Sequence, residues 1–179
     1  MNTANSDVIS GDAIRPAARP GRRHLPDTII AILNRIPHSA IALLGRFAIA
    51  MTFWVSGQTK IEGLVLDPIG RTVEFGMPRL SDSAVELFRS EYALPIIPPE
   101  LAAYLAATVE HLLPLLLLLG LATRVSALGL LVMTLVIQIF VYPLAFPTHA
   151  MWATVLLYLI ARGPGAISLD HLFTRRRGR

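Results

Sequence analysis

The chain has 179 residues, of which 54% are hydrophobic and 16% charged, and its mean hydropathy is +0.57. This length suits one domain, and the composition is too apolar for a protein whose whole surface faces water. The sequence contains no cysteine, which excludes disulfides, thiolate metal sites and cysteine nucleophiles. The formal net charge is +4, but the basic residues gather in two tails beside apolar segments, which favours contact with anionic lipid over nucleic-acid binding.

Two segments precede the first long apolar run. Residues 1–25 mix Asn, Ser, Asp, Pro, Gly and Arg without an apolar period, so we expect a disordered basic tail. Residues 26–37 begin and end with proline and are too short to span a bilayer. They are predicted to form a short interfacial helix, and a helix that only packs on the rest of the protein is the alternative.

Four segments are apolar enough to cross a bilayer, which takes about 20 residues in a helix. They cover residues 39–57, 101–122, 125–142 and 149–161. The fourth reaches membrane length only if residues 144–148 belong to it, and a re-entrant or interfacial segment is the alternative. The sequence therefore predicts an all-α membrane protein, a four-transmembrane-helix bundle over residues 38–162, with a basic tail at 163–179.

A loop of 42 residues, 58–99, separates the first two spans and is predicted to face water. Ser83 and Glu86 within it have the spacing of a capping box. Val85, Phe88 and Tyr92 would fall on one face of the short helix that follows, which we expect to pack on the end of the bundle.

The arginines predict the orientation of the chain. They gather before the first span and after the fourth, whereas the 42-residue loop is acidic on balance and the connection 142–149 has no Lys or Arg. Basic segments stay on the cytoplasmic side. Both termini are therefore expected in the cytoplasm, and the long loop is expected to be extracytoplasmic.

Charged side chains inside the spans are the first candidates for a functional site, because an unpaired charge at mid-membrane depth costs at least about 2.5 kcal/mol. Arg46 and Glu110 lie well inside the first and second spans, at depths that differ by roughly 6 Å, so an ion pair between them is predicted. His111 borders the same region, and Pro114 frees the carbonyl of Glu110. Arg46, Glu110 and His111 are thus the predicted intramembrane polar pocket, with a purely structural clamp as the alternative.

A second set of polar residues lies where spans begin or end. Ser56, Gln58 and Lys60 end the first span and His149 begins the fourth, so these four are expected to line the mouth of the pocket. The alternatives are snorkelling of Lys60 to the interface and an ordinary helix-end position for His149. No metal ligands are assigned, because scattered methionines in an apolar chain are more typical of core packing than of a soft-metal site.

The order of these features resembles the DoxX-like family of small integral membrane proteins. The similar pieces are Arg46, FWVSGQTK at 53–60, Glu110 with Pro114, LGLATR at 119–124 and GPGAISLD at 163–170. The resemblance implies a four-helix bundle in the bacterial inner (plasma) membrane. The extended Arg-rich N-terminal tail departs from the family pattern.

Two further pieces, EYALPIIPP at 91–99 and VIQIFVYP at 136–143, resemble one branch of this family. Its members occur beside multinuclear iron oxygenases and small secreted metal-handling peptides, and other members of the family resemble subunits of thiosulfate:quinone oxidoreductase. The resemblance implies an accessory role in a redox or metal-stress system, with an oxidoreductase or a metal-handling protein as partner.

Three functions are left open. The first is an accessory subunit whose polar pocket binds a quinone or relays protons for a partner oxidoreductase. The second is a structural scaffold without a ligand, and the third is a small transporter or metal-export helper, which would require a homo-oligomer. The sequence has no nucleotide-binding loop, catalytic triad or haem-attachment motif, so we do not expect an autonomous enzyme.

Overall fold

The computed structural model describes residues 29–30 and 33–177, and it divides the chain into two units, Met1–Arg35 and Ile36–Arg179. The predicted tail at 1–25 lies outside the described residues. Of the predicted interfacial helix at 26–37, the structure describes residues 29–30 and 33–37, where the Asn34 N–H donates to the Ile30 carbonyl at 2.9 Å. The account below concerns the second unit.

Four helices of this unit are long and apolar enough to cross a membrane. They are α2 (His38–Gln58), α4 (Pro99–Leu119), α5 (Thr123–Val136) with its π-helical continuation η2 (Ile137–Val141), and α6 (Phe146–Arg162) with the preceding 3₁₀ turn η3 (Pro143–Ala145). The fourth span therefore includes residues 144–148 and has full membrane length. The prediction of an all-α four-transmembrane-helix protein is confirmed.

The ends of α4 follow from its residue types. Pro99 occupies its first turn, where the missing N–H has no intrahelical partner to lose. Pro114 lies inside the helix, which nevertheless continues to Leu119. Gly120 then adopts a left-handed conformation with φ of 66°, which ends α4 three residues earlier than the predicted boundary at Ala122.

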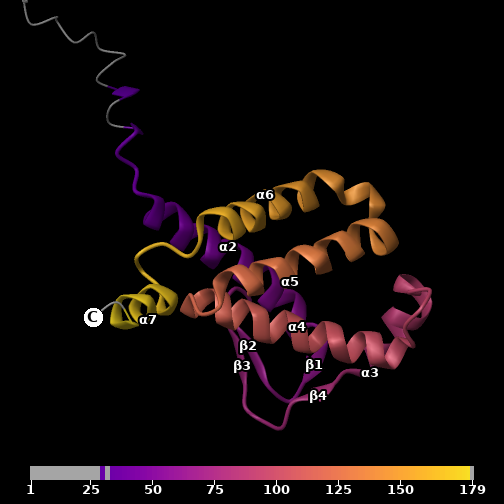
Figure 1. Cartoon of the computed structure of the whole chain (residues 1–179). Helices are drawn as coiled ribbons and strands as arrows, with labels where there is room; N and C mark the ends of the chain where they lie inside the picture. Colours follow the sequence, from indigo (N-terminus) through magenta and orange to yellow (C-terminus); the bar gives the residue numbers. More distant parts are fainter. Residues whose placement is uncertain (1–28, 31–32, 178–179) are drawn as a thin grey trace, which may run out of the picture. The chain divides into compact units, whose positions relative to one another are not determined.

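Neighbouring helices of the bundle run in opposite directions (Figure 1). Ser56 near the end of α2 contacts Glu110 in the middle of α4, whereas Arg46 in α2 lies against Gly120 just past the end of α4. On its other side α2 packs on α6, and α5 packs on both α4 and α6. The chain thus closes an up-and-down ring of four helices.

The core of the bundle consists of four leucines, one isoleucine, one phenylalanine and three alanines. Small residues let membrane helices approach closely, since lipid offers no hydrophobic driving force between them. The buried members are Ala42, Ile49, Ala50, Phe53, Leu117, Ala127, Leu130, Leu156 and Leu159. Large apolar side chains such as Leu44, Phe47 and Leu112 are exposed on the outer surface, as expected for helices that face lipid.

The loop between α2 and α4 contains two nested β-ladders that were not predicted from the sequence. Strand β1 (Ile61–Glu62) pairs with β4 (Arg79–Leu80), and inside them β2 (Val65–Asp67) pairs with β3 (Thr72–Glu74), both antiparallel. Strands of two or three residues carry too short an apolar alternation to be recognised from sequence.

The predicted short helix in this loop is present as α3 (Asp82–Leu87) and the π-helical η1 (Phe88–Tyr92). As predicted, Val85, Phe88 and Tyr92 pack against the bundle, on alanines of α4. The predicted capping box is wrong, because the helix begins after Ser81 and Ser83 lies inside it. The Ser81 N–H donates to the Lys60 carbonyl at 2.9 Å, so the end of the β1–β4 pairing sets where the helix starts.

The predicted basic tail at 163–179 contains a further helix, α7 (Leu169–Arg177). It lies at the end of the bundle where α2 begins and α6 ends (Figure 1). The helix follows a segment with two glycines in positive-φ conformations, Gly163 and Gly165. A methyl group on Gly165 would lie 2.8 Å from Ser39 Cα, so this segment passes close to the start of α2.

Candidate functional site

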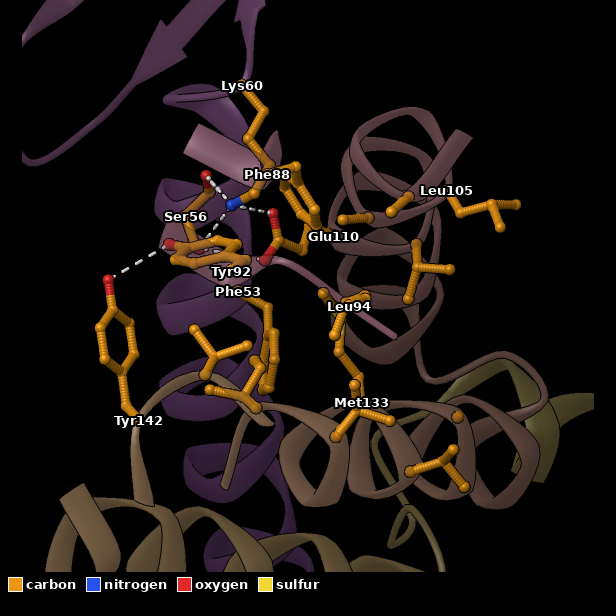
Figure 2. Close-up of a pocket in the computed structure, with 18 of the residues that line it drawn as sticks. Phe53, Ser56, Lys60, Phe88, Tyr92, Leu94, Leu105, Glu110, Met133 and Tyr142 are labelled. Carbon is orange, nitrogen blue, oxygen red and sulfur yellow. Dashed lines mark hydrogen bonds and ion pairs between the residues drawn. The ribbon is translucent and has the colours of Figure 1, made fainter. Parts of the chain in front are cut away.

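Glu110 forms a buried ion pair with Lys60. Lys60 Nζ lies 2.7 Å from Glu110 Oε2, and the side chains are 6% and 2% exposed. The ammonium also donates to the carbonyl and the hydroxyl of Ser56, both at 3.1 Å, and the Ser56 hydroxyl donates to Glu110 Oε1 at 3.0 Å. An ammonium has three protons, so the protein can satisfy all of them without water. Figure 2 shows the three side chains converging: Ser56 from α2, Glu110 from α4, and Lys60 from the turn that follows α2.

The predicted ion pair between Arg46 and Glu110 is wrong. Side chains in an α-helix lean toward the N-terminus of their own helix. Because α2 and α4 run in opposite directions, Arg46 leans toward His38 and Glu110 leans toward Pro99. The two side chains therefore diverge, and Lys60, which was expected at the mouth of the pocket, is the counter-ion of Glu110 instead.

Arg46 belongs to a separate polar cluster at the opposite end of α2. Its side chain is buried, and its Nη2 donates to the Ile167 carbonyl at 2.6 Å. Gly120 makes room for it, since a methyl group there would overlap with Arg46 Nη1. The carboxylate of Asp170 accepts the N–H groups of Ala122 (2.8 Å) and Thr123 (2.9 Å) and so caps α5. Arg46, LGLATR and GPGAISLD are thus brought together as a clamp that holds the segment after α6 against the bundle.

His111 has two hydrogen-bond partners and does not border the pocket of Glu110. Its Nδ1 lies 2.6 Å from the Ala107 carbonyl, which can only accept, so Nδ1 carries the proton. Its Nε2 then accepts from Gln58 Nε2 at 2.8 Å, and Gln58 Oε1 accepts the Leu66 N–H at 2.6 Å. The predicted pocket position of His111 is therefore wrong, because this chain of bonds turns its ring toward β2.

A cavity of about 430 Å³ lies beside the Lys60–Glu110 pair (Figure 2). Its walls come from α2, α4, α5, η1, η2 and α6 and are mainly apolar or aromatic, with Phe53, Phe88, Leu105, Met133 and Trp152 among them. Of the residues predicted for the pocket and its mouth, the cavity is lined by Ser56, Lys60, Glu110 and His149. Arg46, Gln58 and His111 do not line it.

The hydrogen bonds around His149 fix which of its ring nitrogens carries the proton. Gln138 Nε2 donates to the Pro143 carbonyl at 2.7 Å, which turns Gln138 Oε1 toward His149 Nδ1, also at 2.7 Å. Since an amide oxygen only accepts, Nδ1 is the protonated nitrogen and Nε2 carries the lone pair. His149 is 5% exposed, and its Nε2 has no hydrogen-bond partner in the part of the chain that the structure describes.

Two tyrosines at the edge of the cavity were not among the predicted site residues. The Tyr142 hydroxyl donates to Glu91 Oε1 at 2.7 Å and lies 3.5 Å from the Tyr92 hydroxyl. These hydrogen bonds, first that with Tyr92 and then that with Glu91, raise the pKa of Tyr142. Tyr92 is the last residue of the π-helical η1, and Tyr142 follows the last residue of the π-helical η2. Such π-helical turns are frequent at functional sites. The sequence signal was present in EYALPIIPP and VIQIFVYP, which contain all three residues.

The DoxX family model matches residues 41–143, more than half of the chain. The matched region contains Arg46, Lys60, Glu110 and Tyr142, whereas His149 and Asp170 follow it. Comparison with curated protein sequences and with solved structures found no match. The extent of the family match and the four membrane-length helices identify the chain as a multi-pass membrane protein that belongs to the DoxX family.

Proposed function

We propose that this protein is an accessory subunit of a bacterial inner-membrane redox system and binds a quinone in the cavity beside Lys60 and Glu110. The observation that carries the proposal is a buried ion pair in the wall of a mainly apolar cavity. The volume of about 430 Å³ lies within the range of small-molecule pockets, which are mostly apolar with a few placed polar groups. A lipid-soluble ligand is favoured over a water-soluble one, because the cavity lies among membrane-length helices.

The polar groups of the cavity suit the two ends of a quinone head group. A quinone ring is flat and apolar and carries two carbonyl oxygens on opposite sides. The Lys60 ammonium would release its hydrogen bond to the Ser56 hydroxyl and donate that proton to one of these oxygens. At the other oxygen, His149 Nε2 would accept the hydroxyl of the reduced form. Phe53, Phe88 and Trp152 offer aromatic surface for the ring between them.

Reduction of the quinone takes two electrons and two protons and yields the quinol. The partner oxidoreductase supplies the electrons. The first proton would come from the Lys60 ammonium, and the second from His149 once its ring has been protonated. Lys60 and His149 would then each regain a proton from water. Both side chains line the cavity.

Tryptophan fluorescence tests the binding directly, because the sequence has two tryptophans and Trp152 lines the cavity. In a Trp54→Phe background, Trp152 is the sole reporter. A benzoquinone with a short alkyl tail, added to the protein in detergent, should quench it saturably. Glu110→Gln and His149→Phe should each weaken binding about tenfold, the effect of one lost polar contact of about 1.4 kcal/mol.

The exposed ion pair between Arg79 and Glu62 provides the matched control. Glu62→Gln removes the same charge as Glu110→Gln but lies in the β1–β4 ladder, so quenching should be unchanged. Quenching without saturation, or equal affinity for Glu110→Gln and Glu62→Gln, would exclude the quinone site.

A structural scaffold is the second candidate, and one observation favours it. All three donors of the Lys60 ammonium are satisfied inside the protein, as in a clamp between α2 and α4. A scaffold predicts that Glu110→Gln lowers the melting temperature in detergent and leaves the saturable quenching unchanged. The quinone proposal predicts a loss of quenching in protein that is still folded.

A further inference from the structure

A recess with a basic lining lies at the end of the bundle remote from Lys60. It occurs where α2 and α5 begin and α6 ends, next to α7 (Figure 1). Its volume is about 540 Å³, and its polar lining residues are His38, Thr123, Arg124, Arg162, Asp170, His171 and Thr174. It shares no residue with the cavity of the proposed quinone site.

The charge of this recess is positive. Arg124 and Arg162 are both exposed and form no ion pair with the described residues. Asp170 is the single carboxylate in the lining, and both of its oxygens already accept backbone N–H groups of α5. Asp170 is thus already engaged at the start of α5, and the two guanidinium groups remain available for a ligand. Thr123, buried beneath the recess, has a hydroxyl with no partner among the described residues.

The recess lies where three membrane-length helices begin or end. Thr123 is the first residue of one membrane-length helix and Arg162 is the last residue of the next, while His38 begins another. Residues at the ends of membrane-spanning helices reach the polar region of the bilayer. The phosphate groups of the lipids occupy this layer.

An apolar stripe leads from the recess along the outside of α5. Val125 lines the recess, and Leu128, Val132 and Leu135 follow it at spacings of three, four and three residues. All four are at least half exposed, with values of 71%, 52%, 53% and 50%. Residues spaced this way share one face of a helix, and an acyl chain lying on that face would have its head group at the recess.

We propose that this recess binds the phosphate of an anionic phospholipid, with one acyl chain along Val125 and Leu128. Arg124 and Arg162 bind the phosphodiester oxygens from two helices, and His38 and His171 add donors at the rim. Guanidinium groups match phosphate geometry with paired N–H donors. The apolar stripe selects a lipid over free phosphate, because inorganic phosphate gains nothing from it.

Native mass spectrometry of the protein in a non-ionic detergent tests this proposal. The probes are phosphatidylglycerol and phosphatidylcholine with the same acyl chains. Wild type should retain phosphatidylglycerol in preference to phosphatidylcholine. Arg124→Gln and Arg162→Gln should each lower this preference about fivefold, since one basic residue near an anionic surface contributes about 1 kcal/mol.

Two control variants separate charge from structure. Arg79→Gln removes one positive charge from the loop between α2 and α4 and should keep the preference. Arg124→Lys keeps the charge and should retain most of the preference. A melting temperature of Arg124→Gln equal to that of wild type would show that its loss of preference is not a folding defect. Equal retention of both lipids by wild type, or an unchanged preference in the double Arg124→Gln, Arg162→Gln variant, would overturn the proposal.

Competition with inorganic phosphate distinguishes a site for a lipid phosphate from a site for free phosphate. Millimolar phosphate should leave the bound phosphatidylglycerol in place. If phosphate binds lipid-free protein and displaces the lipid, the recess is a site for a free anion and the lipid proposal is wrong.

Discussion

Lys60 and Glu110 form a buried ion pair inside the bundle, and each depends on the other for its burial. The ion pair is 2.7 Å long and nearly solvent-free. Removing one partner of such a pair leaves an uncompensated buried charge, whereas replacing both with apolar residues often costs little. Single substitutions in this pair should therefore lower the free energy of unfolding much more than single substitutions in an exposed ion pair.

Lys60→Met should lower the free energy of unfolding by about 3–5 kcal/mol, because Glu110 remains buried without its counter-ion. The double variant Lys60→Met, Glu110→Leu should recover most of this loss. Thermal unfolding in detergent measures both. Arg79→Met, which breaks the exposed pair with Glu62, should cost about 1 kcal/mol or less. Losses that simply add in the double variant would contradict the coupling.

Gly120 has two reasons to lack a side chain. Its φ of 66° is costly for other residues, and a methyl group would overlap with Arg46. Gly120→Ala should therefore lower stability by about 1–3 kcal/mol and displace the Arg46 guanidinium.

Gly129→Ala is the matched control for this variant. Gly129 is helical, and the atom that a new methyl group would meet is the mobile end of Leu113, which can turn aside. The change should stay within about 1 kcal/mol, since alanine also favours the helix. A smaller melting-temperature drop for Gly120→Ala than for Gly129→Ala would show that the Arg46 cluster tolerates displacement.

At the scale of elements, α7 is tied to α5 through the side chain of Asp170. Its carboxylate accepts from Ala122 and Thr123, and the Asp170 N–H donates to the Gly120 carbonyl at 2.9 Å. One residue thus caps the first turn of α5 and anchors the start of α7. The sequence predicts only a basic tail at this place, and this contact cannot be read from it, because the partners are about 50 residues apart along the chain.

Asp170→Ala should lower stability by about 1–2 kcal/mol through loss of the cap. It should also release α7, which makes the bonds after Arg175 and Arg176 faster to cleave with trypsin in detergent. Asp82→Ala is the control, because Asp82 lies in the first turn of α3 and makes no capping hydrogen bond there. Equal cleavage rates for the Asp170→Ala and Asp82→Ala proteins would argue against an anchored α7.

The contact of Tyr142 with Tyr92 and Glu91 of η1 makes the stability of the protein depend on pH in the alkaline range. The pKa of Tyr142 is raised by its hydrogen bonds with Tyr92 and Glu91, so the folded state holds the phenol proton more tightly than the unfolded chain does. The hydrogen bonds of Tyr142 therefore contribute their full stabilisation to the folded state at pH values below about 10, the pKa of a tyrosine in the unfolded chain. This contribution is lost as the pH rises from that value toward the higher pKa of Tyr142 in the folded protein.

Unfolding of wild type and Tyr142→Phe at a series of pH values measures this effect. The stability difference should be constant from neutral pH to about pH 9 and shrink above about pH 10. Tyr104→Phe is the control, since Tyr104 is exposed on α4 and makes no hydrogen bond through its hydroxyl to described residues. A difference that grows with pH would reverse the assigned direction.

At the scale of the whole molecule, the distribution of arginine predicts the orientation in the membrane. The native chain has no cysteine, so single cysteines can be introduced as accessibility labels. In intact cells, a membrane-impermeant maleimide should label Glu74→Cys in the loop between α2 and α4. Arg175→Cys in α7 should react only after permeabilisation, because basic segments remain cytoplasmic. The opposite pattern would reverse the topology.

The number, type and approximate limits of the membrane helices followed from the sequence alone. A bilayer demands about 20 apolar residues per span, and this requirement can be read locally along the chain. The fourth span was ambiguous until the structure joined residues 143–145 to α6. The β-ladders at 61–80 and helix α7 were missed, because their short patterns carry little information without their tertiary contacts.

The polar residues of the site were also visible in the sequence, but their partners were not. A buried Glu110 requires a counter-ion, and the sequence contains two candidates, Arg46 within α2 and Lys60 just past its end. The opposite directions of α2 and α4 decide between them, since each side chain leans toward its own helix N-terminus. Sequence by itself determined that this protein crosses a membrane and buries charge there; tertiary structure alone decided which charges meet, because that depends on the relative direction and rotation of packed helices.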